Sequence, residues 1–164
     1  MKRSKVTLNN LERISSLHTL LDSHRLCGDH QKAIDIWKKN TLPVYKQQLG
    51  DHPWTASILS YIADSYKSLA DGSSEPGYIK QAEIYFKEAL EQRKKLLGDH
   101  QDTARSHVQL SDVFVLQGQF DEALEELNKA FVLQNDILGP DHKITRNTVS
   151  KQSDVMDKRG SNHR

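Results

Sequence analysis

The sequence contains one cysteine, Cys27, and no run of apolar residues in it approaches the ~20 that a membrane-spanning helix needs. A lone cysteine cannot form an internal disulfide, and it is typical of a protein from a reducing compartment. The basic residues near the N-terminus are not followed by the apolar stretch of a secretory signal. We therefore expect a cytoplasmic protein that has no membrane partner.

An excess of charge of either sign is also missing, since 23 Lys and Arg residues stand against 22 Asp and Glu residues. This balance predicts no nucleic-acid partner, because nucleic acids select strongly basic surfaces. Apolar residues make up only 36% of the chain, and the mean hydropathy is −0.70. So low an apolar content favours an elongated array with a large surface over a compact globule.

Sequence signatures of catalysis are absent as well. The chain has no G-x-G-x-x-G motif, no phosphate-binding P-loop and no H-E-x-x-H metalloprotease motif. We therefore expect a protein that is not an enzyme and that binds no cofactor.

The sequence does contain a repeated tetrapeptide. LGDH occurs twice and LGPDH once, with their glycines at Gly50, Gly98 and Gly139. The first two glycines are 48 residues apart and the last two are 41 apart. The difference of seven residues falls in a turn-rich insertion within 71–78, and without those seven residues both periods are 41. A period of this length is typical of a solenoid in which each unit is one supersecondary motif.

Each unit is predicted to contain two helices. The first, helix A, begins at the histidine of the repeated tetrapeptide, which we expect to cap it, and the second, helix B, ends at the next glycine, which favours a C-cap. Small or apolar residues recur on one face of helix A, and helix B repeats a small–large–small pattern. The helix A core positions are Ile14, Leu17, Leu21, His24 and Gly28; Ala56, Leu59, Ala63, Tyr66 and Ala70; and Ala104, His107, Ser111, Phe114 and Gly118. The helix B positions are Ala33, Trp37 and Asn40; Ala82, Phe86 and Ala89; and Ala123, Leu127 and Ala130.

The segment QGQFDEALEELNKA and the LGPDH hinge resemble tetratricopeptide repeats, and the period resembles that of the kinesin light chain and nephrocystin subgroup. The resemblance covers residues 8–159 and implies an all-α fold, a right-handed α-solenoid of antiparallel helix pairs in a single domain over 1–164. Three pairs are expected over about 8–49, 50–97 and 98–138, followed by a capping helix over about 142–159.

Two departures from the repeat predict local irregularities. The first helix B has one residue more than the others before its glycine and contains Pro43, so we expect a kink or bulge over 40–43. The final unit has residues at the core positions that are too polar to receive another helical pair, which is typical of a capping helix. These residues are Arg146, Val149, Ser153, Met156 and Gly160.

One cluster contains residue types that bind zinc, namely His24, Cys27 and His30, each separated from the next by two residues. The repeat explains the same residues without a metal, because His24 has the core position of Tyr66 and Cys27 lies beside a turn glycine. We expect no metal site.

The resemblance implies a non-catalytic scaffold that binds a partner peptide or domain in a concave groove lined by helix A. One groove position is aspartate in all four units, namely Asp22, Asp64, Asp112 and Asp154. Cations one turn away account for the first two but not for Asp112, so we expect an extended partner with basic residues and an aliphatic residue against the groove valines. The predicted partner-binding residues are His18, Asp22, Arg25, Ser60, Asp64, Lys67, Arg105, Val108, Asp112 and Val115.

The sequence leaves three questions open: the role of the chain, the role of the insertion and the role of Trp54. The chain could instead be an assembly or regulatory segment of a larger signalling protein that self-associates, or packs on another domain, through Leu8 and Leu11. The insertion over 71–78 is either neutral surface variation or a further site that projects Tyr78. Trp54, in the first turn of a helix A, is either a staple of the hinge against Tyr45 or Leu49, which we expect, or an exposed anchor for a partner.

Overall fold

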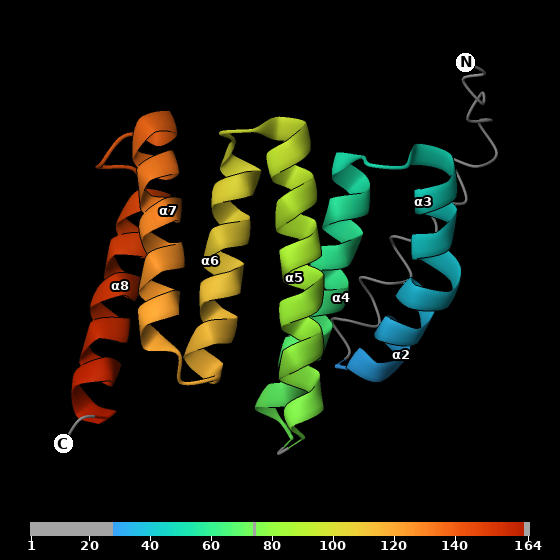
Figure 1. The fold of residues 1–164 in the computed structure, drawn as a ribbon, viewed down its shortest axis with the longest axis horizontal. Coiled ribbons are helices and arrows are strands. Elements are labelled where there is room, and N and C mark those ends of the chain that lie inside the picture. The colour runs from blue at the N-terminus through green and yellow to red at the C-terminus, as the bar shows by residue number, and fades with distance from the viewer. Residues whose placement is uncertain (1–27, 74, 163–164) are drawn as a thin grey trace. The chain divides into compact units, whose positions relative to one another are not determined.

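The computed structural model describes residues 28–73 and 75–162, and within these ranges every regular element is helical (Figure 1). The helices pack as adjacent pairs, which confirms the predicted fold class. Their bounds are α2 His30–Ile36, the π-helix η1 Trp37–Thr41, α3 Leu42–Leu49, α4 Pro53–Asp71, α5 Pro76–Leu97, α6 Gln101–Leu116, α7 Phe120–Leu138 and α8 Lys143–Asn162.

The chain divides into two compact units, Met1–Tyr85 and Phe86–Arg164, with the boundary inside α5. No helix in the described ranges combines the length and the apolar character that crossing a membrane would require.

The repeated tetrapeptide forms the same turn each time. Gly98 ends α5 with a φ of +60°, and His100 then caps α6, because its Nδ1 accepts a hydrogen bond from the Asp102 N–H at 3.1 Å. The positive φ favours glycine, which has no Cβ to clash. Gly50 and Gly139 have φ values of +60° and +86°, and Nδ1 of His52 and of His142 accepts the N–H of Trp54 and of Ile144. The predicted capping roles are confirmed.

A threonine three residues after the histidine completes this turn, a feature that the sequence interpretation missed. Thr103 Oγ1 donates to the Gly98 carbonyl at 2.8 Å, and Thr55 Oγ1 donates to the Gly50 carbonyl at 3.0 Å. Both threonines are buried. Each one satisfies a carbonyl at the C-terminal end of a helix, where no intrahelical donor is available.

We expect His100→Ala to lower the free energy of unfolding by about 1 kcal/mol, because the Asp102 N–H loses its acceptor at the helix N-terminus. His100→Asn keeps a capping oxygen and should have almost no effect. Urea unfolding followed by circular dichroism measures both variants. Equal losses in the two would show that the histidine acts through something other than its cap.

Most of the predicted core positions within the described residues are buried. Gly28 and Gly118 are exposed and Ala70 is only partly buried, so the last helix A position is wrong. Ile14, Leu17, Leu21 and His24 lie outside the described residues. In the first unit, Leu59 packs among fully buried alanines of α4, and in the second, Leu127 does the same on α7. The buried helix A residues are Ala56, Leu59, Ala63, Tyr66, Ala104, His107, Ser111 and Phe114, and the buried helix B residues are Ala33, Trp37, Ala82, Phe86, Ala89, Ala123, Leu127 and Ala130. Small residues at fixed intervals let neighbouring helices approach closely around the larger side chains.

The first helix B contains the predicted irregularity. Residues Trp37–Thr41 form a π-helix, in which the N–H of Leu42 bonds to the carbonyl of Trp37, five residues earlier. The wider turn absorbs the additional residue. One predicted core position is wrong as a result, because Asn40 is exposed and Thr41 is fully buried in its place.

Two further expectations need correction. The insertion over 71–78 is not all turn, since α4 continues to Asp71 and α5 already begins at Pro76, so half of its residues are helical. Trp54 is not a buried staple, because 48% of its surface is exposed. The ring beside it is that of His52, with the centroids 5.5 Å apart and an edge-on orientation.

The last helix, α8, packs on α7 through a polar face. Its most buried residues are Thr145, Thr148 and Val155. Val149 and Met156, at the positions that in α4 and α6 pack against a helix B, are 47% and 53% exposed. This orientation is the one expected of a capping helix.

Candidate functional site

The predicted binding residues of the first unit fall into three groups. His18, Asp22 and Arg25 lie outside the described residues. Asp64 and Lys67 are partly exposed on α4 and form an ion pair with a distance of 3.9 Å between Oδ1 and Nζ. Ser60 is only 3% exposed, so the expectation that it lies open on this face is wrong.

The second unit presents its predicted residues along one side of α6. Arg105 is exposed and makes no ion pair with any residue in the described ranges, whereas Val108, Asp112 and Val115 are partly buried. These residues are three or four positions apart, so the helix places them in a line.

A cavity of about 540 Å³ lies beside this line, between α6, α8 and the end of α7. Its wall is apolar at Val108 and Ile144, and Arg105 and Asn147 add polar groups. Gln134 and Thr148 also line it; they are buried and joined by a 2.6 Å hydrogen bond. The residues that line it are Gln101, Asp102, Arg105, Val108, Gln134, Ile144, Asn147, Thr148 and Lys151.

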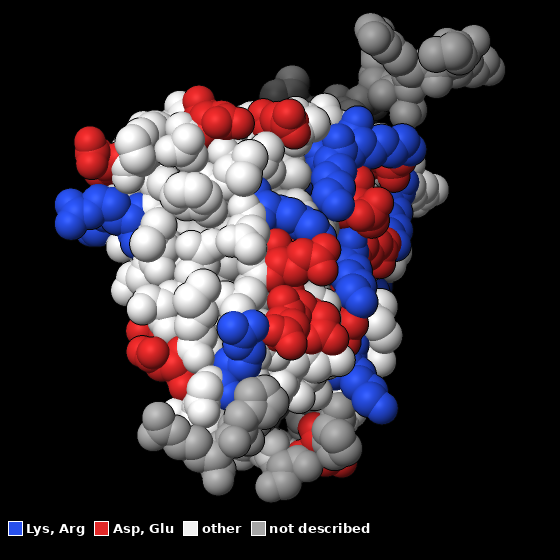
Figure 2. Space-filling model, turned by 60° about the vertical axis from the view of Figure 1, so that its left-hand side comes forward, with Lys and Arg blue, Asp and Glu red and all other residues white. Residues whose placement is uncertain are grey.

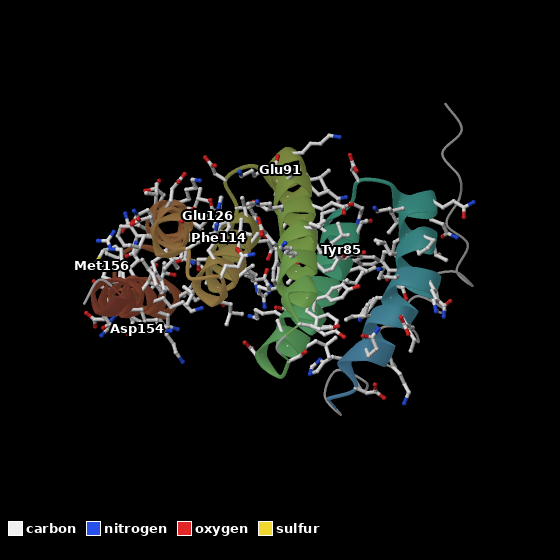
Figure 3. All side chains as sticks on the ribbon, turned by 60° about the horizontal axis from the view of Figure 1, so that its bottom comes forward. Tyr85, Glu91, Phe114, Glu126, Asp154 and Met156 are labelled. Atoms are coloured by element: carbon white, nitrogen blue, oxygen red, sulfur yellow. The ribbon has the colours of Figure 1, made fainter. Side chains whose placement is uncertain are left out.

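More of the groove aspartates form ion pairs than the sequence indicates. Asp112 on α6 forms an ion pair with Lys151 on α8, 39 residues later, so the expectation that no cation accounts for this aspartate is wrong. Asp154, labelled in Figure 3, and Asp157 are exposed on α8, and neither has an ion pair with a described residue. Uncompensated acidic charge is therefore found toward the C-terminal half of α8, away from the cavity.

On the face seen in Figure 2, Lys and Arg are interleaved with Asp and Glu, and no large patch has one sign. Neighbouring charges of opposite sign offset one another, so a surface of this kind has a weak net field.

A second group of titratable residues lies in the interior of the second unit. His107 Nδ1 is 2.6 Å from Glu126 Oε2, and Lys129 Nζ is 2.8 Å from the other carboxylate oxygen. Burial raises the pKa of Glu126, but the hydrogen bonds from His107 and Lys129 outweigh this and lower it to about 2. His107 occupies a core position, and we interpret this cluster as packing between α6 and α7.

Metal ligands are not assembled in the part of the chain that the structure describes, since no group of three or more His, Cys, Asp or Glu could hold an ion there. His30 begins α2. The other two residues of the candidate zinc cluster, His24 and Cys27, lie outside the described residues.

The family model of the tetratricopeptide repeat matches residues 79–136. The fold is similar to that of a Podospora anserina protein described as a kinesin light chain with nearly identical tetratricopeptide-like repeats, at a TM-score of 0.74 and 19% identity over 90% of this chain and 67% of that one. A form of that protein with one substitution gives the same values. BtubC (BKLC) from P. vanneervenii is similar at a TM-score of 0.72 and 17% identity, over 92% of this chain and 58% of that one.

No curated protein matches the sequence. Tetratricopeptide repeats generally mediate protein–protein interactions and are typically not catalytic. Residues 79–136 therefore match the tetratricopeptide repeat, and the chain has the fold of kinesin light chain repeats.

Proposed function

We propose that the chain is a non-catalytic interaction scaffold that holds an extended partner segment along the helix A side of its second unit. The observation that carries this proposal is the cavity between α6 and α8, which combines apolar walls with a few polar groups. Ligand sites have this composition, because apolar contact provides affinity and the polar groups fix orientation. Arg105 and Val108, two of the residues that the sequence indicates, line it.

The lining residues define the chemistry of the segment. An aliphatic side chain fits against Val108 and Ile144, and the Asn147 amide can pair with a peptide main chain. Arg105 favours a carboxylate or carbonyl oxygen, since its guanidinium has donors available.

The expected preference for a basic residue in the partner is assigned to a second part of the surface, the C-terminal half of α8. Asp154 is seven residues after Asn147, which places it on the same side of α8 and about 10 Å farther along the helix. We propose that a Lys or Arg of the partner contacts Asp154 or Asp157, whose carboxylates have no ion pair with a described residue. Asp64 and Lys67, in the first unit, stay candidate contacts for the partner. Self-association through Leu8 and Leu11, which lie outside the described residues, stays the alternative.

Selection of a displayed library of random 12-residue peptides on the whole chain tests this proposal. We expect Arg105→Glu to weaken the selected peptides by about tenfold or more, because an attractive charge becomes a repulsive one in a half-enclosed site. Fluorescence anisotropy of the labelled peptide measures the affinity.

Lys39→Glu makes the same charge change at an exposed lysine of the first unit that does not line the cavity and is far in sequence from Asp154 and Asp157, so it serves as the matched control. If the peptides bind Arg105→Glu unchanged, or lose equal affinity in both variants, then the cavity is not their site. Asp154→Asn should weaken only those selected peptides that carry a basic residue.

A further inference from the structure

Three tyrosines of the first unit gather beside one lysine. Tyr66 on α4 and Tyr85 on α5 are stacked, with centroids 5.8 Å apart and an angle of 13° between the rings. Tyr78, in the first turn of α5, lies 6.3 Å from Tyr66. The Lys38 ammonium is 5.8 Å from the Tyr66 centroid and 5.9 Å from that of Tyr85. We call Tyr66, Tyr78 and Tyr85 the tyrosine cluster; Figure 3 labels Tyr85.

The bonding of Lys38 is unusual for a lysine, because its partners in the described ranges are aromatic. Its Nζ donates to Tyr66 Oη at 3.3 Å, and this bond raises the pKa of Lys38 against the opposing effect of burial. No carboxylate of the described residues forms an ion pair with it. The tyrosine cluster therefore holds an ammonium group through ring faces and a phenol oxygen, which is the chemistry of cation–π recognition.

One part of this arrangement recurs and is structural. Lys87 follows Phe86 as Lys38 follows Trp37, and its Nζ lies 5.6 Å from the centroid of Phe114 in the second unit. A lysine of helix B over the aromatic ring of the next helix A is thus a feature of the repeat. The Lys87 ammonium therefore meets one ring and no phenol oxygen, whereas the Lys38 ammonium meets two rings and a phenol oxygen.

The other parts of the cluster have no equivalent in the second unit. Tyr85 corresponds to Glu126, which bonds to His107 and Lys129. Tyr78 comes from the insertion that lengthens the second repeat. Glu75, three residues before it, raises the pKa of the Tyr78 phenol through its negative charge and a hydrogen bond.

The cluster is also open to exchange of its occupant. Lys38 is exposed on the π-helix, and Tyr78 and Tyr85 are partly exposed, whereas Tyr66 is buried at their centre. A lysine side chain has a flexible four-carbon stem, so its head can leave the rings without movement of the backbone.

We propose that the tyrosine cluster is a binding site for the ammonium group of a partner lysine, and that Lys38 is its internal occupant. A partner lysine takes the place of the Lys38 ammonium, lies against the Tyr66 and Tyr85 rings and donates to Tyr66 Oη. The site lies in the first unit and does not depend on the cavity of the second unit, so either proposal can fail alone.

The test uses the whole chain with 3-fluorotyrosine at its five tyrosines and butylammonium chloride as the probe, followed by ¹⁹F NMR. In Lys38→Met, the probe should shift three of the five resonances saturably, with an affinity about tenfold higher than in the unsubstituted chain, because the competing internal ammonium is gone. Sodium chloride at equal concentration should shift none of them.

Lys87→Met is the matched control, since it removes the equivalent lysine beside a single phenylalanine, and it should leave the probe affinity unchanged. Adding Tyr85→Leu to Lys38→Met should abolish the saturable shift. If Lys38→Met does not fold, Lys38→Gln replaces it. A folded variant with no saturable shift, or with equal shifts of all five tyrosines, would overturn the proposal.

Discussion

Replacing His107 by leucine is expected to destabilise the protein by about 2–3 kcal/mol, although leucine is the residue that the first unit has at this position. The reason is Glu126, whose side chain is about one-tenth exposed and lies 2.6 Å from the imidazole. Removing one partner of a buried pair leaves the other charge without compensation. The remaining contact with Lys129, at 2.8 Å, keeps the loss below the 3–5 kcal/mol of a fully orphaned charge.

A double-mutant cycle separates this pair from simple packing. Glu126→Leu alone and His107→Leu alone should each destabilise, while the double substitution should recover most of the loss, because an apolar pair of similar volume needs no compensation. Urea unfolding at neutral pH measures all four proteins. Strictly additive losses would contradict a direct interaction between the two side chains.

The same pair gives the stability a defined pH dependence. The pKa of Glu126 is lowered from 4.5 to about 2 in the folded chain, so the unfolded state binds this proton more readily. Its contribution is therefore fully present above pH 4.5 and is lost as the pH falls toward 2. Unfolding measured across this range should show a shallower acid loss in the double variant than in the unsubstituted chain.

Features set by local sequence could be predicted. The glycine and histidine of each hinge determine the backbone turn and the cap within a few residues, so LGDH alone indicates where one helix ends and the next begins. The core positions follow in the same way, because a helix presents residues three and four apart on one side. The burial of Ala63 and Phe86 could be predicted from this spacing without knowledge of which helices pack together.

Features set by contacts between distant segments could not be predicted. Lys151 pairs with Asp112 from 39 residues away, and nothing near either residue indicates it. Ser60 has a groove position by spacing alone, but its burial depends on what packs over α4. Four of the nine residues that line the candidate cavity come from α8, whose buried and exposed faces both mix polar with apolar residues and therefore look alike in the sequence.

The π-helix is the feature on which sequence and structure agree most closely, and it leads to the second large expected effect. Deleting Asn40 shortens the distance from Ala33 to Gly50 by one residue, to the value found in the other two repeats. The buried residues Thr41, Leu42 and Tyr45 then follow Trp37 at three, four and seven positions, which is the spacing of a continuous α-helix.

Pro43 opposes that continuous helix. In a regular turn its ring would clash with the carbonyl four residues earlier and one hydrogen bond would be lost, at a cost of about 3 kcal/mol. In the π-helix the N–H of Leu42 reaches back to Trp37 instead, and the wider turn leaves room for the ring. We therefore expect deletion of Asn40 alone to destabilise the chain by about 3 kcal/mol.

Pro43→Ala alone should change the free energy of unfolding by less than about 1 kcal/mol, because the additional residue keeps the wide turn in place. Deletion of Asn40 combined with Pro43→Ala should return the stability to that of the unsubstituted chain or above it, since both causes of the irregularity are then removed. Urea unfolding of the four proteins measures this non-additivity. If Pro43→Ala does not rescue the deletion, the π-helix is held by its packing around Trp37 and not by the proline and the additional residue.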